Sequence, residues 1–134
     1  MFAVNQKARA TIETLIEGLN VGSAKKIDNT EGVYMTLHVE RLTENTFSLA
    51  HYYEQNGDLM PDPDMVFWRA LTGDFYPVEI TMATGYHQKL MHFGDDGQPS
   101  GFNPKGQKDA AGFAGTWCQN IRAQQGIKPA KKAA

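Results

Sequence analysis

Three aspartates lie within the seven residues Asp58-Leu59-Met60-Pro61-Asp62-Pro63-Asp64. Carboxylate oxygens are the ligands that hard divalent cations prefer. Asp58, Asp62 and Asp64 are therefore candidates for a metal site, with Glu79 as a further ligand. The spacing does not match an EF-hand loop, which alternates its ligands around a central glycine. A metal centre here would make the protein a small metal-dependent hydrolase or nuclease.

The same seven residues also have a purely structural interpretation. They follow Asn56-Gly57, the favoured pair for a two-residue type I′ hairpin turn, because both positions take φ > 0. The two prolines remove amide donors, which argues against a place in the middle of a sheet. We expect Asp58 and Asp62 to accept hydrogen bonds from amides of their own loop, and Asp64 to begin the next strand. In an extended chain Asp62 and Asp64 could share a side, while Asp58 would lie apart.

A third interpretation is recognition. The stretch would then be an exposed loop that presents four side chains to a partner: Asp58, Met60, Asp62 and Asp64. The sequence shows no complete catalytic pattern, so catalytic residues remain unassigned. We therefore expect a protein that is not an enzyme and that needs no cofactor.

The histidines all fall on predicted strands: His38, His51, His87 and His92. Antiparallel neighbours could bring two or three of them to one face beside a glutamate, as in a zinc or acid–base site. No pair has a ligand spacing such as His-X-His. One residue of register slip also moves a side chain to the opposite face. Half-exposed histidines on a sheet are the simpler expectation.

Alternating apolar and polar residues indicate strands through the middle of the chain. The predicted strands are 33–40, 46–55, 64–71, 76–83 and 86–93. Their short links favour antiparallel neighbours, because a parallel crossover needs many more residues. Apolar residues at helical spacing predict helices over 5–19 and 107–124. The segment 22–32 between the first helix and the first strand reads as a polar connection.

This order predicts an α+β two-layer sandwich. An antiparallel meander of about five strands would carry the N-terminal and C-terminal helices on one face. The other face would be left to solvent or to a partner. We expect one domain over residues 1–126 and a flexible basic tail over residues 127–134.

Several strand side chains are candidates for the open sheet face: Tyr52, Glu54, Trp68 and His87. Aromatic rings on an open sheet stack nucleic-acid bases, so single-stranded nucleic-acid binding is an alternative function. Core packing and cross-strand pairs are the simpler use of such rings. Few basic residues accompany them, and the net charge of −2 supplies no general attraction for phosphates.

Cysteine usage and hydropathy bear on location. The single cysteine, Cys118, cannot form an internal disulfide, which favours a reducing compartment and a buried structural thiol. No apolar run approaches the roughly 18 residues that a membrane span needs. The N-terminus does not read as a secretory signal. The expected location is the cytoplasm, without membrane contact.

The centre of the chain, over about residues 51–90, resembles a family of small bacterial proteins of unknown function. The resemblance rests on the stretches HYYEQNGDLMPDPDMVF and YPVEITMATGYHQKL. Proteins of this kind are found on conjugative plasmids, integrative elements and phages. The resemblance implies a setting and no chemistry. Our hypothesis is a non-enzymatic accessory protein of a mobile genetic element that binds a protein partner.

Overall fold

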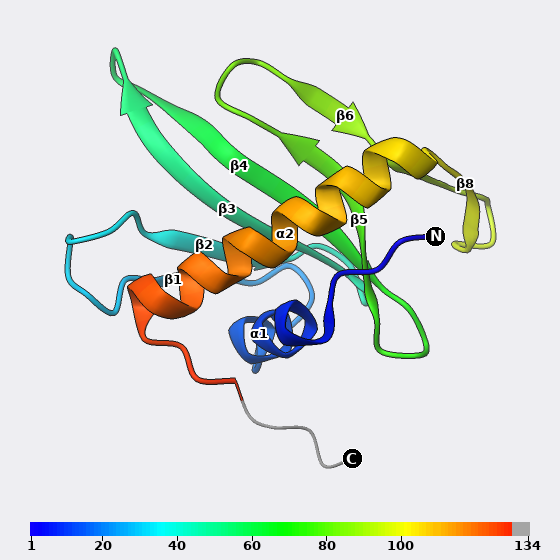
Figure 1. The fold of residues 1–134 in the computed structure, drawn as a ribbon, viewed down its shortest axis with the longest axis horizontal. Coiled ribbons are helices and arrows are strands. Elements are labelled where there is room, and N and C mark those ends of the chain that lie inside the picture. The colour runs from blue at the N-terminus through cyan, green and yellow to red at the C-terminus, as the bar shows by residue number, and fades with distance from the viewer. Residues whose placement is uncertain (130–134) are drawn as a thin grey trace.

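The computed structural model describes residues 1–129, so residues 130–134 of the predicted basic tail lie outside the described residues. One layer is a six-stranded antiparallel sheet, and the other consists of two helices (Figure 1). The strands are neighbours in chain order: β1 Ala24–Ile27, β2 Leu37–Arg41, β3 Thr46–Gln55, β4 Asp58–Arg69, β5 Phe75–Thr81 and β6 His87–Lys89. This meander confirms the predicted α+β arrangement.

Both helices begin at an asparagine cap and lie on the same face of the sheet (Figure 1). The side chains of Asn5 and Asn103 accept hydrogen bonds from first-turn amides of α1 Gln6–Ile16 and α2 Pro104–Gln125. α2 ends at Gly126, whose φ of 63° is in the left-handed region that favours glycine. Both predicted helices are present, although α1 ends before residue 19.

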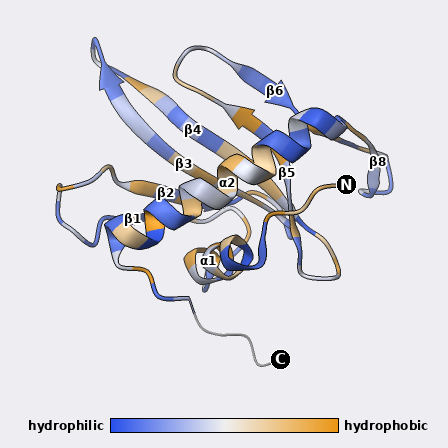
Figure 2. Ribbon diagram, in the orientation of Figure 1, coloured by the Kyte–Doolittle hydropathy of each residue, from blue (hydrophilic) through white to orange (hydrophobic). Residues whose placement is uncertain are grey.

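The core lies between the helices and the sheet, where apolar residues gather (Figure 2). Its fully buried members include Ile12, Leu15, Leu37, Leu49, Met65, Phe67, Phe75, Leu90 and Ile121. Cys118 is buried among them, as predicted. Burial raises the pKa of this thiol to about 12, so the sulfur stays protonated at neutral pH.

The first and the last of the predicted strands differ from expectation. β1 lies within the segment 22–32, which the sequence indicated as a connection, and residues 33–36 lie outside the sheet. An edge strand with one neighbour buries little, so the residues of β1 show only a weak alternation. The predicted strand 86–93 is split. Its first part is β6, and Met91–Phe93 forms β7, which pairs with β8 Pro99–Phe102 in a separate hairpin.

The aspartate–proline stretch is part of a strand, and the expectation of a loop there is wrong. β4 begins at Asp58 and pairs with β3 from its first residue. β5 reaches β4 only at Asp64, opposite Thr81. The prolines therefore lie where β4 has a neighbour on one side alone, which agrees with their expected absence from the middle of the sheet. Asn56 and Gly57, with φ of 53° and 84°, confirm the predicted turn.

Candidate functional site

The register of the sheet decides which side chains share its open face, opposite the helices. One row across the strands contains Lys26, His38, Ala50, Asp64, Thr81 and His87. The next row contains Ala24, Glu40, Ser48, Val66, Glu79 and Lys89. Directly opposite residues point to the same face, so the middle of this face combines small side chains with charged ones.

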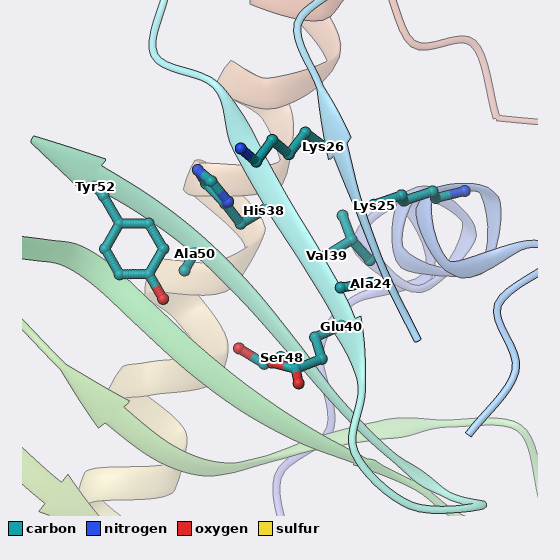
Figure 3. A pocket seen from close by; sticks show the side chains of 9 residues that line it. All are labelled: Ala24, Lys25, Lys26, His38, Val39, Glu40, Ser48, Ala50 and Tyr52. Carbon is teal, nitrogen blue, oxygen red and sulfur yellow. The ribbon is translucent and has the colours of Figure 1, made fainter. Parts of the chain in front are cut away.

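A pocket of about 440 Å³ lies on this face between β1, β2 and β3 (Figure 3). Lys26 and His38 lie toward one end, and Glu40 with Ser48 toward the other (Figure 3). The His38 ring meets Tyr52 edge to face, with 4.9 Å between ring centroids. The pocket therefore has a basic end and an acidic end, joined by an aromatic side.

Asp64 adjoins the acidic end of the pocket. The Ser48 hydroxyl donates a hydrogen bond of 3.0 Å to its Oδ1 atom. Burial raises the pKa of Asp64; the Ser48 bond opposes this shift, and the Glu79 and Glu40 carboxylates add to it. Among residues 1–129 no basic side chain lies within ion-pair distance of Asp64 or Glu40. Asp64 and Glu40 thus carry negative charge that no ion pair of the described residues neutralises.

The other two titratable side chains of the pocket are uncharged at neutral pH. Burial lowers the pKa of His38, and the Lys26 ammonium lowers it further. Burial also raises the pKa of Tyr52, with smaller contributions from Asp64 and Glu40. Lys25 also borders the pocket, but its ammonium donates a hydrogen bond to the carbonyl oxygen of Glu17. The charges that a ligand would meet are therefore those of Lys26, Glu40 and Asp64.

A second hollow, of about 280 Å³, lies further along β3 and β4. Thr46 and Trp68 are opposite each other there and stand two residues beyond Ser48 and Val66, so they belong to the same open face. The hollow is lined by the β2–β3 turn, Trp68 and the β7–β8 hairpin: Thr43, Glu44, Asn45, Thr46, Trp68, Phe93 and Gly97. We call this second hollow the aromatic cup.

The aspartates of the opening stretch do not converge. β4 has an extra residue where His51 alone faces Asp62 and Pro63, and such a bulge changes the direction of the side chains. The carboxylates that raise the pKa of Asp64 are Glu79 and Glu40, whereas Asp62 acts on His51. Within the described part of the chain, no group of three or more His, Cys, Asp or Glu side chains is placed to hold a metal ion.

The expected hydrogen bonds of the aspartates are also wrong. Asp58 lies at the end of the β3–β4 hairpin opposite Gln55, and Met60 lies opposite Tyr53. Of the residues that the structure describes, none donates a hydrogen bond to the side chain of Asp58 or Asp62. Because this part of β4 is extended and paired, its amides do not turn back toward their own side chains.

The histidines lie on strands, as predicted, but do not meet. His38 and His87 are at opposite ends of one row, and His87 Nε2 lies 2.9 Å from Glu79 Oε1. His51 lies on the helix side and accepts a hydrogen bond from Trp117 of α2. His92 lies on the separate hairpin, in β7.

The predicted sheet-face residues lie in different places. Tyr52 lines the pocket and Trp68 lines the aromatic cup. Glu54 lies near the end of the β3–β4 hairpin, opposite Leu59. The sequence did not indicate Lys26, since β1 itself was not predicted, or Ser48, whose place on the open face depends on the register of β3. Only the weak alternation of β1 and the register of β3 could have indicated them.

The family model for a domain of unknown function, DUF6908, matches residues 7–127. The chain belongs to the DUF6908 family. This match covers the whole sheet, all of α2 and all but the first residue of α1, and it confirms the resemblance to a family of unknown function. No curated protein and no solved structure matches the chain. No helix of residues 1–129 is long and apolar enough to cross a membrane.

Proposed function

We propose that this DUF6908 protein is a non-enzymatic binding protein that holds a basic segment of a protein partner on its open sheet face. The observation that carries the proposal is the environment of Asp64. This carboxylate lies near Glu40 and Glu79 and has a hydroxyl partner, but no cation. An arginine from a partner would stabilise the cluster, since a guanidinium donates several hydrogen bonds to carboxylates.

The shape of the pocket supports the same kind of ligand. Ala50 and Ser48 are small and buried, so the space above them is open to a side chain from outside. Lys26 stands at the other end of the pocket and would attract an acidic group of the same segment. The preferred ligand is therefore a segment that carries both a basic and an acidic side chain.

The charge of the face and the positions of its carboxylates argue against the two alternative functions. The carboxylates that attract a basic segment repel phosphates, which argues against nucleic acid on this face. A metal-dependent hydrolase or nuclease would need Asp58, Asp62, Asp64 and Glu79 at one point. Asp64 and Glu79 lie near each other, but Asp62 acts on His51 and Asp58 lies at the end of the hairpin. The resemblance of residues 51–90 supports the proposed setting, which is a mobile genetic element in a bacterial cytoplasm.

The test is the binding of a labelled arginine-containing peptide, measured by fluorescence anisotropy at low and at physiological ionic strength. We expect Asp64→Asn and Glu40→Gln each to weaken binding by about tenfold, because a lost charge-assisted contact costs on the order of 1.4 kcal/mol. Asp58→Asn is the matched control, because it removes the same charge at the tip of the hairpin. A peptide with citrulline in place of arginine should not bind.

Two outcomes would contradict the proposal. One is a wild-type protein that binds no arginine peptide at low ionic strength. The other is an Asp58→Asn variant that loses as much affinity as Asp64→Asn, since binding would then follow net charge and not the site. A single-stranded oligonucleotide that displaces the peptide would favour the nucleic-acid alternative.

A further inference from the structure

The aromatic cup holds a tryptophan ring in a fixed position. The ring centroids of Trp68 and Phe93 are 5.9 Å apart, with 65° between the ring planes. Tyr76 packs against the same indole at 5.8 Å. Neighbours on two sides restrict the rotamers of Trp68, while the ring still lines an open hollow.

The turn that forms the rim of the cup is also held in place. The Arg41 guanidinium donates to the carbonyl oxygens of Leu19, Thr43 and Glu44, at 3.0, 3.4 and 2.7 Å. The hydroxyls of Thr43 and Thr46 share a hydrogen bond of 2.6 Å. These hydrogen bonds hold the Arg41 guanidinium against the backbone of the turn. The cup is therefore formed before a ligand arrives, which lowers the entropy cost of binding.

We propose that the cup binds the guanidinium group of an arginine from the same partner segment, stacked on Trp68 and bonded to Glu44. A guanidinium is planar, so it can lie against an indole and still donate hydrogen bonds from its edge. The volume of about 280 Å³ suits one long side chain rather than a whole small molecule. Glu44 is exposed at the rim and supplies the carboxylate.

The inference rests on the proposed function and adds a spacing to it. Asp64 and Trp68 are four residues apart on one strand and face the same side. A strand rises about 3.3 Å per residue, so the two positions are roughly 13 Å apart. An extended partner segment covers that distance with the same number of residues. The partner segment should therefore read Arg-X-X-X-Arg, with one arginine at Asp64 and the other in the cup.

The cup can be tested by itself with N-acetylarginine amide and the neutral, nearly isosteric N-acetylcitrulline amide. The measurement is the NMR shift of the Trp68 indole N–H during titration. Trp117 is the internal reference, because its indole is buried beneath α2 and bonded to His51. We expect a saturable shift of Trp68 with the arginine amide alone. Glu44→Gln should weaken it several-fold, and Glu54→Gln, at the far end of the hairpin, should not.

A peptide with the predicted spacing tests the link between the two sites. Each arginine is replaced by citrulline in turn, and loss of the arginine that enters the cup should weaken binding to the wild type by about tenfold. The same replacement should have no effect on Trp68→Leu, whose fold is checked by circular dichroism. If Trp68→Leu does not fold, Trp68→Phe keeps a ring and should retain part of the difference.

The outcomes separate the two proposals. The proposed arginine site in the cup is wrong if the arginine amide does not shift the Trp68 indole signal, or if the citrulline amide shifts it equally. A tighter fit for a trimethyllysine amide than for the arginine amide overturns the guanidinium assignment. If the cup binds arginine but Asp64→Asn does not change the affinity for the peptide, the proposed function is wrong and the arginine site in the cup still holds.

Discussion

The hydrogen bond between Trp117 and His51 links α2 to the sheet inside the core. The indole Nε1–H donates to His51 Nδ1 at 3.2 Å, and the rings meet edge to face with centroids 5.5 Å apart. Because Nδ1 accepts, the ring hydrogen of the neutral imidazole is on Nε2. That atom is buried without a partner within residues 1–129. Burial is also the main reason that the pKa of His51 is lowered.

We predict that Trp117→Phe lowers the free energy of unfolding by about 3 kcal/mol. The smaller ring gives up about 2 kcal/mol of buried apolar surface, and an unpaired buried His51 Nδ1 adds about 1 kcal/mol. His51→Leu should cost only about 1 kcal/mol, because it leaves the indole N–H unpaired but removes an Nε2 that already lacks a partner. In the double variant neither polar group is left unpaired, so only the lost apolar surface remains, and the cost should fall about 2 kcal/mol short of the sum of the two single-variant costs.

Urea denaturation followed by circular dichroism measures these free energies, with constant m-values as the condition for comparing them. Single-variant costs that simply add would refute the buried hydrogen bond. A pH series supplies a second reading. The lowered pKa of His51 means that the unfolded chain binds its proton more readily, so stability falls as pH drops below about 6.5. His51→Leu should reduce this slope, and His38, whose pKa is also lowered, accounts for part of what remains.

Three other changes test the site and the fold. Asp64→Asn should raise the free energy of unfolding at neutral pH, because the raised pKa of Asp64 means that its ionisation disfavours the folded state. Below about pH 3.9 this gain should vanish, and urea denaturation at both pH values checks it. Gly57→Val should cost about 1–3 kcal/mol, since φ is 84°, and an unchanged melting temperature would contradict the strained turn. Cys118, with a pKa of about 12, should react with a thiol reagent only as fast as the native protein opens; immediate labelling would contradict its burial.

Local signals predicted much of the fold. Helical spacing placed α1 and α2, and Asn56-Gly57 placed the β3–β4 turn. β1 was missed because an edge strand alternates weakly. The aspartate–proline stretch was mistaken for a loop, because proline excludes only those strand positions that have neighbours on both sides.

Of the candidate site, the sequence predicted only the residues that lie on the two longest strands, β3 and β4. Tyr52, Trp68 and Asp64 were selected, but the pocket between Lys26, Glu40 and Asp64 was not foreseen. Lys26 and Asp64 are joined by three successive strand pairings. Each pairing is a contact between residues distant in sequence, so no single segment of the chain indicates that the row exists.

The sequence by itself determined the two helices, the antiparallel meander of the central strands and the buried thiol. These follow from residue periodicity, short links and the conformations of single residues, which are local properties. Only the tertiary structure decided which charges meet. The bulge at His51 separates Asp62 from Asp64, and the register beyond it places Asp64 near Glu40 and Glu79. Side chains alternate along a strand, so one extra residue reverses the face on which every later residue appears.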